Sequence, residues 1–293
     1  MTILVTGGSG QVGFELQRQL CCLGDVRAPS RLELDLTNAA VVDAWLDEHR
    51  PSLIVNAAAS TDVDGAEEAP ELAQRLNAQL PEQLAAYAAQ HKILLVHYST
   101  DYVYPGSGSA PWEESATPAP VNVYGHTKLA GDHAIQRSGC PHLIFRTSWV
   151  YAARGHNFMN TMLRLGGHRT ALSVVDDQIG APTPARLIAL VTQLAINKDI
   201  ESGLYHLAPR GSTSWFGFAK AIFEHARTLD LPLTLDEAQL KAMTTAAYPT
   251  PAKRPLNSRL SLSKLETALG IELPSWRLQL VNTLEERCLL GNG

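Results

Sequence analysis

The sequence predicts an α/β fold: a doubly wound parallel sheet joined to a smaller C-terminal lobe. Three observations predict it. Up to residue 147, short β-branched runs alternate with amphipathic helical stretches, as in βαβ units. The first run leads directly into a glycine-rich turn and a helix, the Rossmann-type arrangement. Beyond residue 150 the alternation loosens. We therefore expect 1–150 to form a Rossmann domain, with final sheet strands contributed from about 171–210, and 151–293 to form mainly an interleaved substrate-binding lobe.

Composition excludes several classes of protein. The 293 residues suffice for one large α/β domain with a small lobe, and a 45% hydrophobic fraction is ordinary for a buried core. A net charge of -5 gives no basic field for nucleic acid or a membrane surface. No signal peptide or membrane span is recognisable. The four cysteines lack metal-ligand spacing, so we expect reduced thiols and a cytoplasmic protein.

The glycine turn follows the first expected strand, Thr2 to Thr6, and precedes a helix from Phe14 to Leu23. Its spacing is GxxGxxG, with Gly7, Gly10 and Gly13. Glycines let the backbone approach a pyrophosphate, whose charge then lies at the helix N-terminus. The alternative is an ordinary glycine-rich loop between strand and helix. No GxxxxGK[ST] motif is present, which disfavours a nucleotide triphosphatase.

The second expected strand, near Asp25 to Ala28, indicates which dinucleotide is bound. NAD-binding folds place a carboxylate after this strand to hold the ribose hydroxyls. Here the chain offers Ser30 and Arg31 instead, which favours the 2′-phosphate of NADPH. A solvated basic loop is the alternative. Asp35, just before a helix from about Asn38 to Glu48, is expected near the adenine.

The third and fourth expected strands, Leu53 to Asn56 and Ile93 to Ser99, flank a long helix around 70–90. Small residues follow the third strand; Ser99 ends the fourth, and Thr100 and Asp101 follow it. Ligands of parallel sheets gather beyond the carboxyl ends of the strands, so these polar residues are well placed for chemistry. The Pro-, Gly- and Ser-rich loop 105–120 that follows is either a mobile lid or a passive linker.

Tyr124 and Lys128 lie four residues apart at the start of the next expected helix, and so share one face. A nearby ammonium lowers the pKa of a phenol, which lets it act as an acid or base nearer neutral pH. A solvated helix face is the alternative. After a fifth strand, His142 to Thr147, we expect helices near 157–165, 185–196 and 215–229, strands at 171–175 and 204–208, and a Pro-rich basic segment at 248–259.

The assembled motifs resemble those of the extended short-chain dehydrogenases/reductases. Five blocks are especially similar to their dTDP-4-dehydrorhamnose reductase branch, and the likeness runs from about residue 2 to 262: HYSTDYVYPG, NVYGHTKLAGDHA, LIFRTSWVY, QIGAPT and YPTPAKRPLNSRL. The resemblance implies reduction of the 4-keto group of dTDP-4-dehydro-β-L-rhamnose by NADPH, the last step of dTDP-L-rhamnose synthesis. The family tolerates either cofactor, so NADH is also acceptable.

The resemblance also implies residue roles. Tyr124 would protonate the sugar oxygen, Lys128 would hold the nicotinamide ribose and lower the Tyr124 pKa, and Thr100 would hydrogen-bond the carbonyl oxygen. The implied cofactor contacts are Gly7, Gly10, Gln11, Val12, Gly13, Asp35, Leu36, Ala59, Ser60, Thr61 and Tyr98. The implied substrate contacts are Thr100, Asp101, Trp149, Asn157 and Arg254, the last near the diphosphate. Trp149 as a core aromatic and Arg254 as a surface charge are the alternatives.

Two further points stay open. Some relatives form dimers around magnesium held by acidic residues. Glu15 is present here, but the expected partner position holds Arg186, a cation that cannot ligate magnesium, so we expect no metal. Whether the chain is a monomer or a homodimer is undecided. The alternative functions are a non-catalytic NADP-binding subunit, resembling the regulatory subunit of methionine adenosyltransferase, and another sugar-nucleotide reductase or epimerase.

Overall fold

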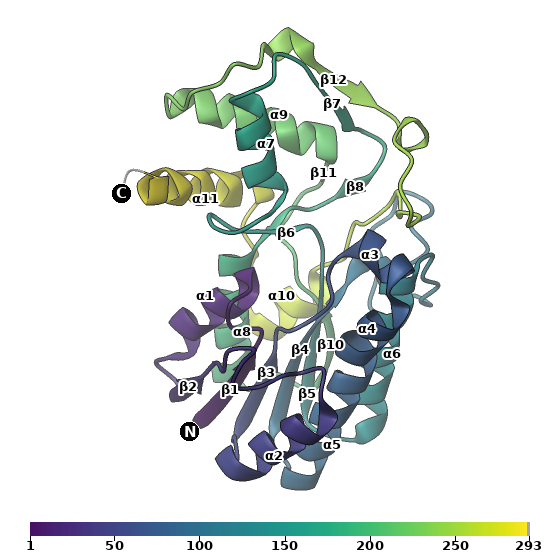
Figure 1. Cartoon of the computed structure of the whole chain (residues 1–293), viewed down its shortest axis with the longest axis vertical. Coiled ribbons are helices and arrows are strands. Elements are labelled where there is room, and N and C mark those ends of the chain that lie inside the picture. Colours follow the sequence, from purple (N-terminus) through teal and green to yellow (C-terminus); the bar gives the residue numbers. More distant parts are fainter. Residues whose placement is uncertain (292–293) are drawn as a thin grey trace.

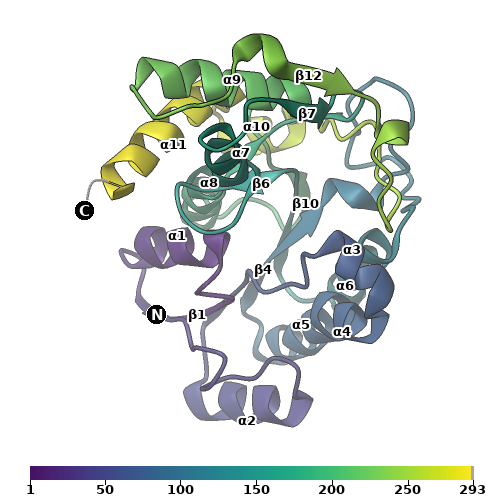
Figure 2. The same cartoon turned by 45° about the horizontal axis from the view of Figure 1, so that its top comes forward.

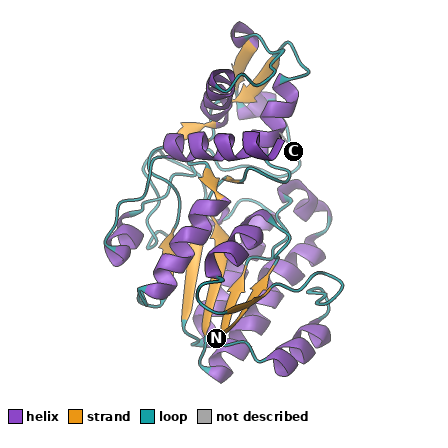
Figure 3. Cartoon of the chain, turned by 90° about the vertical axis from the view of Figure 1, so that its left-hand side faces the viewer, coloured by secondary structure: helices purple, strands orange, loops and turns teal. Residues whose placement is uncertain are grey.

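A computed structural model describes residues 1–291 of the chain. Its core is a six-stranded, entirely parallel sheet with the strand order β10-β5-β4-β3-β1-β2 (Figures 1 and 3). The chain moves outwards from β1 to β2 on one side and from β3 to β10 on the other, so the order switches between β1 and β3, as in a doubly wound sheet, and the predicted fold class is confirmed. The strands are β1 (Thr2–Thr6), β2 (Asp25–Arg27), β3 (Leu53–Asn56), β4 (Leu94–Thr100), β5 (His142–Thr147) and β10 (Gly203–His206).

Helices cover both faces of this sheet (Figure 3). Successive residues of a strand point to opposite faces, and β1 shows the consequence. Ile3 and Val5 are buried on one face of the sheet and Leu4 on the other. The face with Ile3 and Val5 is covered by α1 (Gln11–Leu20), α8 (Ala185–Asn197) and α10 (Ser263–Leu269). The face with Leu4 is covered by α2 (Ala39–His49), α5 (Leu80–His91) and α6 (Val123–Ser138).

A second cluster of helices and short strands, with an apolar core of its own, lies beyond the carboxyl edge of the sheet (Figures 1 and 2). Its core contains Tyr151, Phe218 and Trp276. Its helices are α7 (Phe158–Gly166), α9 (Trp215–Thr228) and α11 (Trp276–Gly291), and its strands are β6 (Val150–Tyr151), β7 (Leu172–Val175), β8 (Ile179–Gly180), β9 (Thr183–Pro184), β11 (Thr213–Ser214) and β12 (Leu240–Met243).

The expectation that the stretch 171–210 supplies several final sheet strands is corrected. Only β10 joins the sheet, beside β5. β7 forms at the expected place but pairs with β12 in the second cluster. An apolar run of four residues specifies a strand but not its partner, because the partner lies about seventy residues further along the chain.

The helix expected over 70–90 is one helical run in three parts. After α3 (Val63–Glu68), the chain forms α4 (Pro70–Gln74), a π-helical segment η1 (Arg75–Gln79) and then α5. A π-helical turn adds one residue to the turn and re-aims the side chains around it, and such turns occur often at functional sites. Here it directs Asn77 towards the carboxyl edge of the sheet, as described below.

The loop 105–120 is fastened to the segment 257–261. The Trp112 amide donates to the Arg259 carbonyl at 2.8 Å, and the Ser261 amide donates to the Trp112 carbonyl at 2.7 Å. Trp112 also stacks on Tyr104 with ring centroids 5.2 Å apart. These contacts favour an anchored connection over a mobile lid. Three 3-10 turns complete the fold: η2 (Asp101–Val103), η3 (Glu237–Gln239) and η4 (Thr245–Ala247). Among the described helices, none is long and apolar enough to cross a membrane.

Candidate functional site

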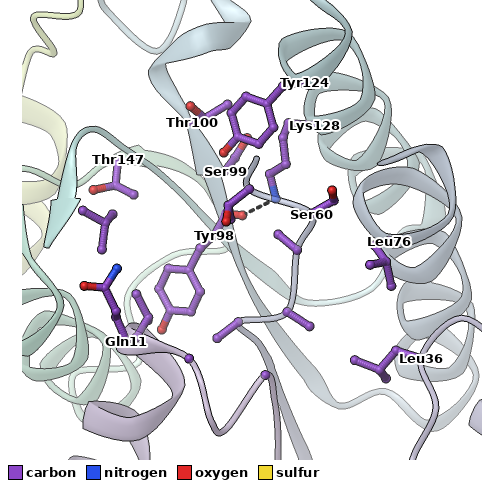
Figure 4. A pocket seen from close by; sticks show the side chains of 18 of the residues that line it. Gln11, Leu36, Ser60, Leu76, Tyr98, Ser99, Thr100, Tyr124, Lys128 and Thr147 are labelled. Atoms are coloured by element: carbon purple, nitrogen blue, oxygen red, sulfur yellow. Dashed lines mark hydrogen bonds between the residues drawn. The ribbon is translucent and has the colours of Figure 1, made fainter. Parts of the chain in front are cut away.

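A cavity of about 830 Å³ runs along the carboxyl edge of the sheet, between the sheet and the second cluster. Figure 4 shows its wall, where side chains from α1, β4 and α6 point into one space. Most residues predicted from the sequence line it: Gly7, Gly10, Gln11, Val12, Arg31, Asp35, Leu36, Ala59, Ser60, Thr61, Tyr98, Thr100, Asp101, Tyr124, Lys128 and Trp149. One cavity therefore joins the predicted cofactor residues to the predicted catalytic residues.

The glycine turn forms one end of the cavity. Gly7 has a φ of +68°, a left-handed conformation that favours glycine. Gly13 does not line the cavity, but a Cβ there would lie 2.1 Å from the Gly7 carbonyl oxygen. The Gly10 amide closes the turn by donating to the same carbonyl at 2.9 Å. The three glycines thus let strand, turn and helix pack closely, which leaves bare backbone facing the cavity.

The region after β2 lies along the same end. Arg31 and Asp35 line the cavity, whereas Ser30 does not. The Ser30 amide donates to the Glu33 carboxylate at 2.7 Å, which fixes the turn. Asp35 accepts from the Thr37 hydroxyl at 2.7 Å and from its amide at 2.9 Å. These hydrogen bonds hold the pKa of the Asp35 carboxyl below its usual range. Arg31 is therefore the cation that this turn presents to a ligand.

The small residues after β3 are held by the π-helical segment. Asn77 is fully buried; it accepts from the Ser60 amide at 2.9 Å and donates to the Ser60 carbonyl at 3.0 Å. It also donates to the Thr127 hydroxyl at 3.2 Å, on the helix that carries Tyr124 and Lys128. Asn77 thus connects the loop beside the glycine turn to the catalytic helix. Nothing in the local sequence pattern signals this role.

Tyr124 stands at the other end of the cavity, on the first turn of α6 (Figure 4). Asn122 caps this helix by accepting from the Gly125 amide at 2.8 Å. Burial raises the pKa of the Tyr124 phenol, and the adjacent Thr100 hydroxyl opposes that rise. The expectation that Lys128 lowers the Tyr124 pKa is not met in this structure. This phenol therefore carries its proton at neutral pH and has one to donate.

Lys128 is buried, and its ammonium points towards β4. Its Nζ donates to the Tyr98 carbonyl at 2.6 Å and lies 3.2 Å from Nε2 of His97 (Figure 4 marks the first of these contacts). Burial lowers the Lys128 pKa to about 8, against an opposing effect of Asp132. The Tyr98 phenol itself hydrogen-bonds Thr192 of α8 at 2.8 Å.

Thr100 ends β4 and Asp101 begins η2, beside Tyr124. The Thr100 hydroxyl donates to Asp101 Oδ1 at 3.1 Å and accepts from the Tyr102 amide at the same distance. Asp101 is 2% exposed, and its Oδ2 has no hydrogen-bond partner within residues 1–291. Burial raises the pKa of this carboxyl to about 7, although the Ser258 and Thr100 hydroxyls oppose the rise. The site therefore contains a carboxyl group that titrates near neutral pH.

Two tryptophans, Trp149 and Trp215, form another part of the cavity wall. Trp149 has a φ of +49°, which is strained for a bulky residue and is held by its surroundings. Its ring stacks on Trp215 with centroids 3.7 Å apart and 13° between the planes. A Cβ on Gly180 would lie 2.8 Å from the Trp149 ring. Both indoles line the cavity, so Trp149 is more than a core aromatic.

Asn157 and Arg254, predicted as substrate contacts, do not line the cavity. Asn157 caps α7, and its amide nitrogen donates to the Gln11 side chain at 2.9 Å and to the Ala152 carbonyl at 2.8 Å. Arg254 makes a two-pronged ion pair with Asp64, at 2.7 and 3.0 Å. Their polar atoms are engaged by the protein, because partners distant in the chain reach them in the fold.

The position considered for magnesium holds charges of both signs. Glu15 is 5% exposed; burial raises its pKa, and Glu286 adds to that effect. Arg186 lies 4.0 Å from the Glu286 carboxylate. Within residues 1–291, no group of three or more metal-ligating side chains is present.

Several lining residues were missed from the sequence. The clearest are Tyr102, Thr147 and Trp215. Thr147 pairs with Thr100 in the register of β4 and β5. Its position at the carboxyl end of the fifth expected strand was the signal in the sequence that could have identified it. Trp215 follows a short strand at a helix start, and no pattern in the sequence places it beside Trp149. Ser99 and Thr147 each keep a buried hydroxyl without a partner among the described residues.

Comparison with known proteins gives consistent matches. The model of the family described as "RmlD substrate binding domain" matches residues 1–288. The chain is 47% identical over 294 residues to the dTDP-4-dehydrorhamnose reductase of Escherichia coli (strain K12), and 48% identical over 295 residues to that of Salmonella typhimurium (strain LT2), with 98% of each chain covered. The crystal structure of dTDP-4-dehydrorhamnose reductase from Bacillus anthracis str. Ames in complex with NADP is similar at a TM-score of 0.90 and 34% identity, covering 97% of this chain and 99% of that one.

Proposed function

We propose a function from one premise: the chain belongs to the RmlD substrate binding domain family. It is an NADPH-dependent reductase that converts dTDP-4-dehydro-β-L-rhamnose to dTDP-β-L-rhamnose. The observation that carries this proposal is that one cavity joins the glycine turn to Tyr124, Lys128 and Thr100. The relatives named above, which cover nearly the whole chain, supply the identity of the sugar nucleotide.

The residues present fit a dinucleotide. The bare backbone of the glycine turn faces the cavity, and a Cβ on Gly7 would lie 2.8 Å from the backbone of Ala57. The hydroxyls of Ser99 and Thr147, which have no hydrogen-bond partner among residues 1–291, supply polar groups further along the wall. Arg31, at the same end as the glycine turn, would hold the 2′-phosphate, which favours NADPH over NADH. When bound, NADPH supplies the hydride.

Tyr124 supplies the proton in this proposal. Its buried phenol keeps its proton at neutral pH, and reduction of a ketone needs one proton on the oxygen. Lys128 lies one helical turn from Tyr124, and its ammonium, which now donates to the Tyr98 carbonyl, would hold the nicotinamide ribose hydroxyls. Thr100 would stabilise the negative charge that develops on the sugar oxygen by a hydrogen bond.

The sugar nucleotide would lie between Thr100 and the two stacked indoles of Trp149 and Trp215. An indole face packs well against the apolar face of a sugar ring or a base. Arg254 would reach the diphosphate only by breaking its ion pair with Asp64, so we assign it a smaller part in substrate binding than the two indoles.

Exposed free thiols at Cys21 and Cys22 accord with a cytoplasmic protein.

The test is substrate-dependent oxidation of NADPH, followed by its absorbance, with dTDP-4-dehydro-L-rhamnose as substrate and product identification afterwards. We expect stoichiometric conversion to dTDP-L-rhamnose, and slower conversion with NADH. Tight NADPH binding without turnover would contradict the reductase and favour a regulatory subunit. Conversion without net loss of NADPH would indicate an epimerase instead.

A further inference from the structure

The Thr100 hydroxyl has more neighbours than it has protons. It accepts from the Tyr102 amide at 3.1 Å, and an amide N–H can only donate. Its single proton points to Asp101 Oδ1, also at 3.1 Å. An ionised carboxylate accepts hydrogen bonds and cannot donate one. As long as Asp101 is ionised, the Thr100 proton is therefore committed to Asp101.

The proposed reduction needs that proton elsewhere. To stabilise charge on the sugar oxygen, Thr100 must donate towards the substrate. It is free to do so only if the hydrogen bond to Asp101 is reversed, with the carboxylic acid O–H donating to the Thr100 oxygen. We propose that Asp101 acts in its carboxylic acid form, as a positioning residue that turns the Thr100 hydroxyl towards the substrate. This inference rests on the proposed function, and it assigns Asp101 a role beyond contact with the sugar.

The surroundings of Asp101 favour the acid form. The side chain is 2% exposed, and its Oδ2 has no partner among the described residues. The polar groups that face it are Thr100 of β4, Tyr102 of η2, Tyr124 of α6 and Ser258 of the C-terminal segment. All four are neutral hydroxyl-bearing residues. Beyond Tyr102 lies the Arg254–Asp64 ion pair, whose charges oppose each other, and beyond Tyr124 lies Asp132, which is paired with Arg146.

Because no cation pairs with Asp101 within the described chain, burial dominates and raises the pKa of its carboxyl to about 7. The acid form is then present below neutral pH and is lost as the pH rises through that value. We expect kcat/KM to fall above pH about 7, by up to about tenfold per pH unit, the limit for one ionisation.

The decisive variant is Asp101→Asn. An asparagine amide can donate to the Thr100 oxygen at every pH. Whatever the absolute rate of this variant, we expect the fall in kcat/KM near pH 7 to disappear. Any remaining fall should lie at about pH 8 or above, where Lys128 titrates. A variant that kept the wild-type fall near pH 7 would overturn the proposal.

A second variant, Ser258→Ala, should shift the fall in kcat/KM without abolishing it. The Ser258 hydroxyl faces the Asp101 carboxyl and lowers its pKa, so its removal should shift the fall to higher pH, by at most about one pH unit. Ser115→Ala, at an exposed site away from the cavity, is the matched control and should leave the profile unchanged. An unmoved profile in Ser258→Ala would contradict the proposal.

Infrared difference spectroscopy separates this inference from the proposed function. Spectra of the NADPH complex on either side of pH about 7 should show the carbonyl band of a buried carboxylic acid at the lower pH, and Asp101→Asn should lack it. If the band is seen but no sugar is reduced, the proposed function fails and the acid form of Asp101 stands. If the wild-type protein lacks the band below pH 7, Asp101 is ionised and the inference is wrong.

Discussion

The two ends of the cavity are built in different ways. The glycine end is continuous in sequence: β1, the turn and the first residues of α1 are neighbours along the chain, and they offer backbone to the ligand. The catalytic end combines side chains from β4, α6, the end of β5 and the start of α9. Contiguous backbone geometry can be predicted from spacing, whereas a side-chain constellation depends on the whole fold. Substitutions at the two ends should therefore fail in different ways.

The largest expected effect is at the catalytic end. Tyr124→Phe removes the proposed proton donor but keeps the ring that packs edge-on against Tyr102. We expect kcat to fall by about 10²- to 10⁴-fold, the usual contribution of a general acid, with NADPH affinity within about twofold of wild type. Steady-state kinetics and a cofactor titration would check this. A full rate in Tyr124→Phe would mean that the proton comes from another group.

At the glycine end, a substitution should harm structure and cofactor binding together. A Cβ in Gly13→Ala would lie 2.1 Å from the Gly7 carbonyl oxygen, so the turn must shift. We expect the free energy of unfolding to fall by about 1–3 kcal/mol, as for other overpacked sites, and NADPH to bind more weakly. Denaturant titration would measure the loss. Gly167→Ala, where the nearest atom is 3.5 Å from the added Cβ, is the control and should be nearly neutral.

Asn77 joins the two ends, so its removal should affect cofactor binding at one end and turnover at the other. Asn77→Ala leaves buried groups of Ser60 and Thr127 without their partner. We expect about 1–3 kcal/mol less stability, with both a weaker cofactor affinity and a lower kcat. Thermal unfolding and steady-state kinetics on the same protein would measure these. Only a stability change, with unchanged kinetics, would show that the π-helical segment does not connect the ends.

The smallest expected effect is also at the glycine end of the cavity, at the exposed Arg31. Arg31→Ala should weaken NADPH binding by about tenfold, or ~1.4 kcal/mol, because a solvated charge contact contributes modestly. NADH lacks the 2′-phosphate, so its affinity should be unchanged. Equal losses for both cofactors would show that Arg31 does not read the phosphate.

The sequence predicted the contiguous parts of the fold well. The strands Thr2–Thr6, Leu53–Asn56 and His142–Thr147 have the expected bounds, because each is a short apolar run between clear turn signals. β7 formed where expected but took β12 as its partner. Pairing is decided by contacts far apart in the chain, which local patterns do not carry.

The same limit applies to the site. Tyr124, Lys128 and Thr100 were found by motif, and the structure brings them to one cavity. What the motif could not supply is where their hydrogen bonds go: Lys128 to the Tyr98 carbonyl, Thr100 to Asp101, and Arg254 to Asp64. Trp215 was missed because its place beside Trp149 depends on how α9 packs, which the sequence around residue 215 does not reveal.

We propose above all that a cofactor held at the glycine end transfers hydride to a sugar nucleotide held at the catalytic end. The most direct test is a single turnover with NADPH deuterated at the reactive carbon of the nicotinamide. We expect deuterium on C4 of the sugar in dTDP-L-rhamnose from the wild-type protein, and a much slower transfer in Tyr124→Phe. A product without deuterium at C4, or no product from wild-type protein that binds NADPH, would contradict this proposal.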